Sequence, residues 1–294
     1  IIMKFKTKIT KKINHKLFKL IYLFNLLAVF TIVGCSSTEE APEERLLEKE
    51  LYDQAQTRLS NENFATAIIS LEALESRYPF GRYAEQAQAE LIYAYYKNYQ
   101  YEAAQSAAER FVNLHPRHPH TDYAYYLKGL SGFTNDSGLL ARYINTDLSK
   151  RDVTQAQSSF DDLSEFVSRF PKSEYAGHAT QRMVYLRNLL AQHEINVAEY
   201  YLERKAFIAA IGRARYIIEH LPKTPQTPKA LNILIVSYKE LGHKDLAEKN
   251  TNILAANYPE FKILNTPSEV SEATWLNTVT FGLFGKKSVP KPSS

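Results

Sequence analysis

The densest group of metal-ligating side chains in the sequence lies in one short stretch, LHPRHPHTD. It contains His115, His118 and His120. Imidazole nitrogens bind transition metals when the backbone holds several of them toward one point. Pro116 and Pro119 interrupt this stretch, and a residue that precedes proline avoids the helical conformation. The stretch is therefore predicted to be a turn with solvated histidines, and no metal site is expected.

The sequence contains no catalytic motif of a known type. The phosphate-binding and dinucleotide-binding glycine motifs, the G-x-S-x-G elbow and the H-E-x-x-H motif are all absent from it. Asp161 and Asp162 are adjacent carboxylates, as are Glu43 and Glu44. Adjacent residues on a helix point in different directions, so neither pair can work as an acid and base together. We interpret them as solvated charges and expect neither enzymatic activity nor a cofactor.

The first part of the chain has the pattern of an export signal. Residues 3–19 are rich in lysine, and residues 20–33, LIYLFNLLAVFTIV, are apolar except for Asn25 and the small hydroxyl residue Thr31. A membrane-spanning helix needs about 20 apolar residues, so this segment is too short to span and has the length of a signal-peptide core. The only cysteine, Cys35, follows directly. One cysteine excludes an intrachain disulfide and a cysteine-rich metal site.

Residues 32–35, Ile-Val-Gly-Cys, resemble the lipobox of bacterial lipoproteins. The resemblance implies that residues 1–34 are removed as a signal peptide and that Cys35 carries acyl chains such as palmitate. Each buried CH₂ of these chains contributes about 0.8 kcal/mol, so two or three chains anchor a protein stably. Ser36 stands where an aspartate would favour retention in the inner membrane, which indicates the outer membrane. Residues 35–45 are predicted to be a polar, lipidated tether, and the alternative is an uncleaved helix with a buried thiol.

The charge of the chain is divided unevenly. Seven lysines and no acidic residue precede Cys35, and the remaining 29 basic residues are outnumbered by 32 acidic ones. Binding of nucleic acid depends on clustered lysine and arginine side chains. We therefore expect no nucleic-acid partner.

Five prolines stand in the same sequence context. A bulky residue precedes each proline, and a small residue lies twelve positions before it. The prolines are Pro79, Pro116, Pro171, Pro222 and Pro259, and the small residues are Ala67, Ala104, Ser159, Ala210 and Ala247. Proline cannot continue a helix, so each one marks the end of a helical unit. The constant offset resembles that of the tetratricopeptide repeat, a pair of helices of about 34 residues.

The predicted fold is all-α, a tetratricopeptide-repeat superhelix of five helix pairs over residues 46–261. Each pair buries its apolar face against its neighbours, so we expect no domain boundary within this range. Two units are longer than the others. Residues 133–152 are predicted to form a loop with a short helix, and one long helix is predicted at about residues 174–204.

Tyrosines gather in three strings that we assign to the first helices of units two, three and four. These strings are LIYAYYKNYQY (91–101), DYAYYLKG (122–129) and AEYYLERKAF (198–207). In tetratricopeptide packing the first helices line the concave groove, which places Tyr52, Tyr93, Tyr96 and Lys97 on that side. Tyrosine offers a large contact area and a hydroxyl at a low entropic cost. We interpret the cluster as a surface that binds polypeptides, although packing is the alternative for any single tyrosine.

Several strings together resemble one family. The lipobox-like leader, RYPFG with Tyr83 close behind, RFVNLHPRHPHTDY, residues 150–152 (Lys-Arg-Asp) and the tyrosine strings are similar to the BamD family. Its members are lipoproteins of the β-barrel assembly machinery in Gram-negative outer membranes. The likeness covers residues 32–260.

The resemblance implies a non-enzymatic scaffold that is lipid-anchored at the periplasmic face of the outer membrane. Its expected partners are the POTRA region of BamA, the lipoproteins BamC and BamE, and the C-terminal signal of unfolded barrel proteins. Carried onto this sequence, the contacts to substrate or BamC are Tyr52, Tyr78, Phe80, Tyr93, Tyr96 and Lys97. The contacts to BamA are Arg213, Arg215 and Tyr238. The alternative is another periplasmic repeat lipoprotein that coordinates cell-envelope or peptidoglycan proteins, which would lack the tyrosine strings.

Residues 262–294 extend beyond the matched region. Ser268 is predicted to cap a short helix. An apolar patch and a polar tail follow, and the patch consists of Trp275, Leu276, Val279 and Phe281. Three roles fit this extension: docking on BamA, contact with the membrane surface, or covering the end of the last repeat. The third is physically the simplest, because the ends of repeat stacks need a cap.

Overall fold

The computed structural model describes residues 47–133 and 147–270 of the chain. Helices alternate with turns throughout these two ranges, and they contain no β-strand. The predicted signal peptide, Cys35, the tether and the apolar patch at 275–281 lie outside the described residues. None of the described helices is both long enough and apolar enough to cross a membrane.

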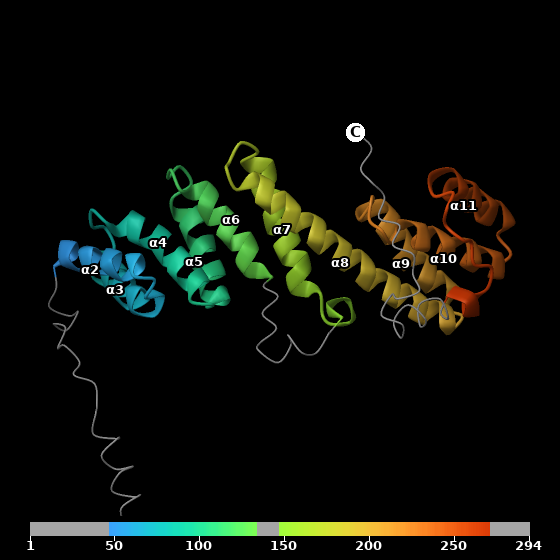
Figure 1. Cartoon of the computed structure of the whole chain (residues 1–294), viewed down its shortest axis with the longest axis horizontal. Coiled ribbons are helices and arrows are strands. Elements are labelled where there is room, and N and C mark those ends of the chain that lie inside the picture. The colour runs from blue at the N-terminus through green and yellow to red at the C-terminus, as the bar shows by residue number, and fades with distance from the viewer. Residues whose placement is uncertain (1–46, 134–146, 271–294) are drawn as a thin grey trace, which may run out of the picture. The chain divides into compact units, whose positions relative to one another are not determined.

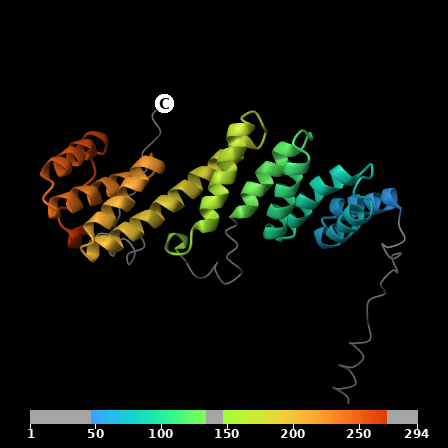
Figure 2. The same ribbon diagram turned by 180° about the vertical axis from the view of Figure 1, so that it is seen from behind.

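The described helices form five consecutive pairs. The first helices of the pairs are α2 (Glu48–Ser60), α4 (Ala84–Lys97), α6 (Thr121–Gly132), α8 (Ala176–Glu203) and α10 (Thr227–Glu240). The second helices are α3 (Phe64–Arg77), α5 (Tyr101–Leu114), α7 (Thr154–Arg169), α9 (Phe207–His220) and α11 (Lys244–Asn257). Each helix packs on the next one along the chain, as Figures 1 and 2 show from two sides. The predicted all-α fold of five helix pairs is confirmed.

The small residues of the repeat allow the two helices of each pair to approach closely. All five are buried, from Ala67 in α3 to Ala247 in α11. In the third pair the hydroxyl of Ser159 also donates a hydrogen bond of 2.6 Å to the carbonyl of Gly129 in α6. A Cβ atom on Gly129 would lie 2.5 Å from a methyl group of Leu163. Contact between α6 and α7 therefore requires glycine at this position.

Each of the five repeat prolines follows the end of a second helix, as predicted. Each second helix ends just before the bulky residue, whose backbone N–H closes the last turn; that of Tyr78, for example, donates to the carbonyl of Leu74 at 2.8 Å. The bulky residues differ in how deeply they are buried. Leu221 is buried, while the corresponding residues of the other four units are half-buried. Proline thus determines where the helix ends, and burial of the residue before it varies.

The turns inside four of the pairs share a left-handed backbone residue. Glu62, Tyr99, Lys205 and Gly242 have φ values of 56°, 62°, 59° and 78°. Each lies five positions before the small residue of its second helix. This conformation suits glycine and is unfavourable for other residues by about 1–2 kcal/mol. Three of the four turns therefore carry local strain that the helix packing holds in place.

The substitution Gly242→Ala should lower the free energy of unfolding by about 1 kcal/mol, because alanine is strained at a positive φ. The same change at Gly212 should raise it by up to about 1 kcal/mol, because Gly212 lies within α9 with open space around its Cα. Urea unfolding of the two variants measures both effects. If both substitutions change the free energy of unfolding in the same direction, this account of the turns is contradicted.

The long helix and the short helix of the insertion are both present. α8 spans Ala176–Glu203 against the predicted 174–204, and η2 (Leu148–Lys150) is a single 3₁₀ turn in the insertion. Ser149 of η2 is buried against α8, where Asn196 donates to its hydroxyl and His193 donates to its carbonyl, each at 2.8 Å. The insertion thus returns onto the middle of α8. Residues 134–146 lie outside the described ranges.

Residues 262–270 run along α10. The buried side chain of Asn232 holds the backbone of Leu264 at both polar groups: its Nδ2 donates to the carbonyl at 3.2 Å, and its Oδ1 accepts from the N–H at 2.9 Å. Val270 is buried in the core. The backbone is helical from residue 267, and Thr266 Oγ1 accepts from the N–H of Glu269 at 3.3 Å. The predicted cap at Ser268 is therefore wrong, because Thr266 occupies the position that precedes the helical turn.

Candidate functional site

Tyrosines link successive first helices by ring stacking. Tyr52 of α2 stacks on Tyr83, with ring centroids 4.5 Å apart, and Tyr126 of α6 stacks on Tyr175 at 4.9 Å. Tyr83 and Tyr175 are the N-cap residues of α4 and α8, and each lies four positions after a stop proline. Sequence reasoning missed these two stacks. The shared offset from proline could have indicated that both tyrosines occupy the same place in their repeats.

Tyr52 is held by packing and by a carboxylate. Its hydroxyl donates to Glu90 of α4 at 3.1 Å, and Glu90 also accepts from Gln86 at 2.7 Å and from Gln56. Burial of the ring, followed by the charge of Glu90 and the hydrogen bond to it, raises the pKa of Tyr52 to about 12. Tyr52 therefore joins α2 to α4, and its ring is half-buried.

This raised pKa predicts a loss of stability at high pH. An unfolded tyrosine ionises near pH 10, whereas folded Tyr52 holds its proton to about pH 12. The stabilisation is therefore complete below pH 10 and is lost as the pH rises from 10 toward 12. The free energy of unfolding, measured by urea titration across this range, should fall less steeply in Tyr52→Phe than in the natural chain. If the free energy of unfolding falls equally steeply with pH in both proteins, the contribution assigned to Tyr52 is contradicted.

The RYPFG turn projects a phenylalanine into solvent. Glu48 of α2 accepts a 2.8 Å hydrogen bond from the N–H of Tyr83, and a Cβ on Gly81 would lie 2.2 Å from the same carboxylate oxygen. Glycine at this position therefore lets the turn close onto α2. Phe80 is fully exposed, and Tyr78 is half-buried at the C-cap of α3. These two predicted contacts lie beside the beginning of α4.

A cation and two aromatic rings meet at the other end of α4. Tyr93 packs edge-on against Phe64 of α3, with centroids 5.8 Å apart. The ammonium of Lys97 lies 5.6 Å from the ring centre of Phe64 and 6.0 Å from that of Tyr93. Lys97 is exposed, and no carboxylate within the described ranges pairs with it. The arrangement leaves a positive charge over an aromatic platform available to a ligand.

The tyrosines of α4 continue into those of α6 and α8, and we call this set the tyrosine row: Tyr93, Tyr96, Tyr123, Tyr126 and Tyr175. Tyr123 lies 5.0 Å from Tyr175 and 6.4 Å from Tyr126, centre to centre. Burial, and then the neighbouring hydroxyls of Tyr175, Tyr93, Tyr126 and Tyr96, raise the pKa of Tyr123 well above its ordinary value. Tyr93, Tyr96 and Tyr123 are half-buried, so parts of their rings remain accessible. The row therefore forms a mostly neutral aromatic surface beside Lys97.

The six predicted contacts to substrate or BamC thus fall into two groups. Tyr93, Tyr96 and Lys97 lie together near the C-terminal end of α4. Tyr78 and Phe80 lie near its N-terminal end, as does Tyr52, which stacks on the N-cap residue Tyr83. α4 has 14 residues, which corresponds to about 20 Å. One predicted detail of the strings was wrong: Tyr101 belongs to the second helix α5.

The three predicted contacts to BamA are on α9 and α10. Arg213 pairs with Glu194 of α8 at 3.3 Å, whereas Arg215 pairs with Glu219 of its own helix at 2.7 Å. The hydrogen bond to Glu219, and then its charge, raise the pKa of Arg215, with a smaller effect from Tyr238. Residues two positions apart on a helix point about 200° apart. Arg213 therefore faces α8, while Arg215 lies on the side of Tyr238.

Part of the histidine cluster and one of the adjacent aspartates are less exposed to solvent than expected. His115 is half-buried and lies 2.8 Å from Gln88, so it is not the solvated side chain that we expected. Burial, and then the charge of His120, lower the pKa of His118. Within the described part of the chain, no three histidine, cysteine or carboxylate side chains are placed to hold a metal.

Asp162 is paired with Lys128 at 3.1 Å and is largely buried, so its interpretation as a solvated charge was wrong.

Comparison with known sequences decides the family. The chain is 38% identical to an outer membrane protein assembly factor BamD of Vibrio cholerae, over 80% of this chain and 97% of the relative. The corresponding proteins of Neisseria meningitidis serogroup B and Xylella fastidiosa are 39% and 38% identical, over 85% and 81% of their lengths and 77% and 80% of this chain. The chain belongs to the BamD family of outer membrane protein assembly factors. A family model described as YfiO, outer membrane lipoprotein, matches residues 45–254.

Solved structures with repeated helices are more distant from this BamD-family chain. A kinesin light chain of Podosopora anserina with tetratricopeptide-like repeats matches 74% of this chain and 95% of its own length, at 16% identity and a TM-score of 0.31. The assembly chaperone of RpL4 matches 84% of this chain and 92% of its own length, at 18% identity and the same TM-score. Such low values do not bear on function. Membership of the BamD family rests on the sequence relatives and confirms the predicted resemblance.

Proposed function

We propose that this chain is a non-enzymatic, lipid-anchored scaffold of the β-barrel assembly complex, and that its tyrosine row binds the C-terminal signal of unfolded barrel proteins. The supporting observation is the position of the exposed Lys97 ammonium over Phe64 and Tyr93, next to Tyr96. A barrel signal of this kind ends in an aromatic residue with a free carboxylate. The ring would pack against the tyrosines, and the carboxylate would pair with Lys97.

The energies suit a transient interaction. An aromatic pair contributes about 0.5–1.5 kcal/mol beyond burial of its area, and an exposed ion pair at most about 1 kcal/mol. An extended peptide gains further affinity from main-chain hydrogen bonds. Such a surface would hold a chain and still release it, as a scaffold that passes substrates onward must do.

The remaining assignments complete the proposal. Acyl chains on Cys35 would anchor the chain at the periplasmic face of the outer membrane, with residues 35–45 as the tether and 46–261 as the repeat region. The last two repeats, through Arg213, Arg215 and Tyr238, would contact the POTRA region of BamA, and BamC and BamE would join the same assembly. The names of the relatives, all assembly factors of the outer membrane, support participation in this complex.

The peptide site is tested by binding of a fluorescent peptide with a barrel-type C-terminus to the purified chain. Loss of two aromatic contacts of about 1 kcal/mol each should weaken binding of the Tyr93→Ala, Tyr96→Ala double variant about 30-fold. The control is Tyr200→Ala, which removes a half-exposed tyrosine from α8, and it should bind like the natural chain. Unchanged affinity in a double variant that unfolds at the normal temperature would contradict the proposal.

The carboxylate contact is tested separately with Lys97→Gln. This variant should bind the free-carboxylate peptide several-fold more weakly, because an exposed ion pair is lost. An amidated peptide should bind the variant and the natural chain equally well. Equal losses for both peptides would show that Lys97 acts on something other than the carboxylate.

The partner assignment is tested by co-purification after mild detergent extraction. We expect BamA in the eluate, and Arg213→Ala together with Arg215→Ala should reduce its amount. Peptidoglycan enzymes in place of BamA would support the alternative, a coordinator of cell-envelope proteins.

A further inference from the structure

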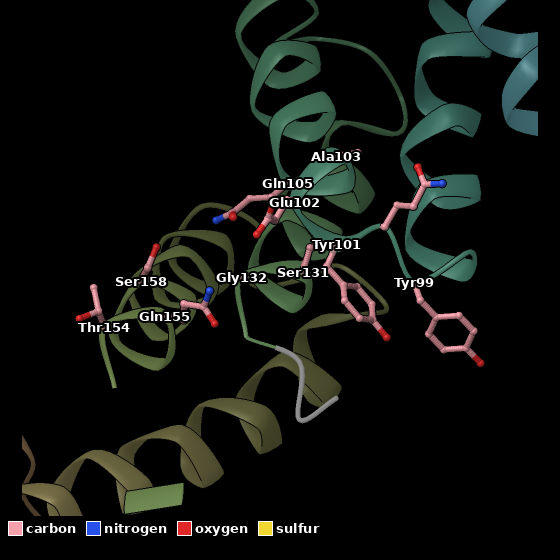
Figure 3. A pocket seen from close by; sticks show the side chains of 11 residues that line it. Tyr99, Tyr101, Glu102, Ala103, Gln105, Ser131, Gly132, Thr154, Gln155 and Ser158 are labelled. Atoms are coloured by element: carbon pink, nitrogen blue, oxygen red, sulfur yellow. The ribbon is translucent and has the colours of Figure 1, made fainter. Parts of the chain in front are cut away.

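A cavity of about 710 Å³ lies beside the tyrosine row, between the beginnings of α5 and α7 and the end of α6. Figure 3 shows Glu102 and Gln105 of α5 extending toward the side where Gln155 and Ser158 of α7 lie. Tyr101 also lines the cavity and is in edge contact with Tyr96 of the row, 5.7 Å centre to centre. The cavity is therefore continuous with the surface proposed to bind peptides.

Amides and hydroxyls are the main polar groups that line the cavity. Three glutamines line it, Gln100, Gln105 and Gln155, and Glu102 is the one charged side chain among its lining residues. No side chain caps α5, and on α7 the carboxylate of Asp152 accepts from the N–H of Thr154 at 2.9 Å. The other N–H groups in the first turns of both helices remain as donors. A ligand for this cavity should carry both donors and acceptors and no negative charge.

Ser131 gives an independent indication of a missing polar partner. Its side chain lines the cavity and is 6% exposed, and its hydroxyl oxygen is buried without a hydrogen-bond partner in the described structure. Buried hydroxyls in folded proteins nearly always have a partner, because leaving one unpaired is unfavourable. A ligand in the cavity would provide that partner.

Two other lining residues are held in place for a ligand. Gln105 donates to Asp162 at 3.4 Å, and Lys128 fixes Asp162 at 3.1 Å. This bond uses the amide nitrogen, so the amide oxygen of Gln105 remains available as an acceptor.

Tyr99 has a left-handed backbone with φ at 62°, and its ring is 73% exposed and in edge contact with Tyr101 at 6.2 Å. The strained turn thus presents an aromatic ring at the edge of the cavity.

Another side-chain amide in this chain shows which kind of group the glutamines of the cavity can bind. Asn232 holds the extended backbone of Leu264 through both of its amide groups, at 3.2 and 2.9 Å. Gln100 and Gln155 offer both amide groups in the cavity and Gln105 offers its amide oxygen, and no segment in the described ranges makes this pairing there. An extended main chain offers the alternating N–H and C=O groups that several glutamines and a serine can bind together.

We propose that this cavity binds the main chain of an extended, uncharged segment of an unfolded polypeptide. Gln105, Gln155 and Ser131 pair with its N–H and C=O groups, and an apolar side chain of the segment packs on Tyr99. The inference rests on the proposed function and adds a second subsite to it, upstream of the terminal carboxylate. Glu102 makes this subsite reject acidic segments, because like charges repel in a confined site.

The test uses the full chain in detergent and a fluorescent barrel-type peptide of about twelve residues, which spans about 40 Å when extended. Ser158→Trp places an indole in the cavity from an exposed position of α7 and should weaken binding at least about tenfold. Ser164→Trp, an exposed position six residues further along the same helix, is the matched control and should stay within about twofold of the natural chain.

A charge exchange tests the selectivity. A peptide with two aspartates in its upstream half should bind the natural chain about tenfold more weakly than the neutral peptide, and Glu102→Gln should recover most of that loss. Ser131→Ala should weaken binding of the neutral peptide several-fold without lowering the unfolding temperature.

The outcomes separate the two proposals. Suppose that Ser158→Trp binds the neutral peptide as tightly as the natural chain, while the Tyr93→Ala, Tyr96→Ala double variant binds it weakly. The cavity then has no role in binding, and the tyrosine row is still the peptide site. Equal rejection of the acidic peptide by Glu102→Gln and the natural chain also overturns the cavity proposal. If the natural chain binds no peptide, the proposed function fails, and the cavity proposal fails with it.

Discussion

Replacing Phe166 by alanine should lower the free energy of unfolding by about 3–5 kcal/mol, the usual range for removal of a fully buried phenylalanine. Phe166 is 0% exposed, and its ring lies 5.8 Å from Tyr126 and 6.0 Å from Phe170. Loss of the ring leaves a cavity that the repeat cannot close, because helices on both sides of α7 are packed against it. The tyrosine row loses part of its support at Tyr126.

Urea unfolding measures this effect, and peptide binding by the folded variant measures its consequence for the row. Phe160→Ala is the matched control, because Phe160 is on the same helix and only half-buried, and it should lose clearly less stability. A loss below about 1.5 kcal/mol in Phe166→Ala would contradict the packing described for the third pair.

Replacing Lys128 by methionine should lower the free energy of unfolding by about 3 kcal/mol, because it leaves a largely buried carboxylate without its cation. Lys128 of α6 contacts Glu109 of α5 and lies 3.1 Å from Asp162 of α7. The Lys128 side chain is 16% exposed and that of Asp162 is 15% exposed, whereas Glu109 is half-exposed. Most of the loss should therefore come from Asp162.

A double-mutant cycle measured by urea unfolding identifies that source. Adding Asp162→Leu to Lys128→Met removes the unpaired charge and should recover most of the lost stability. The hydrogen bond from Lys128 keeps the pKa of Glu109 below its ordinary value, so this pKa should rise in Lys128→Met, as a titration followed by NMR can show. Additive losses in the double variant would contradict the account of the ion network.

The repeat could be predicted from the sequence because its signals are local. Proline ends a helix through its own ring, whatever surrounds it, so the five stops gave the ends of the second helices within a residue or two. The small residue twelve positions earlier indicated where helices approach, and Ala67 and Ala210 are fully buried as this requires. The length of α8 followed from the absence of any break between residues 176 and 203.

Other features depend on contacts between helices and could not be read from local patterns. Tyr99 and Lys205 have left-handed backbones that their residue types do not favour, because the tight turn between packed helices imposes the conformation. Asp162 is buried because Lys128 of another helix reaches it. Thr266 caps the last helical turn in place of Ser268 because the segment before it is fixed by Asn232.

The candidate site was predicted in part. Assigning the tyrosine strings to first helices was enough to place Tyr93 and Tyr96 on one surface with Lys97. The separation of Phe80 from these residues depends on which end of α4 each one occupies, and the cavity depends on three helices at once. Neither follows from the spacing of residues within a single helix.

The central claim is that the tyrosine row holds unfolded barrel proteins, and photo-crosslinking in the native envelope tests it most directly. A photoreactive phenylalanine at Tyr96 should form a product with the C-terminal segment of a β-barrel protein during its synthesis. The same group at Tyr216, an exposed position of α9, should form none. Absence of the product at Tyr96, or equal products at both positions, would contradict the account.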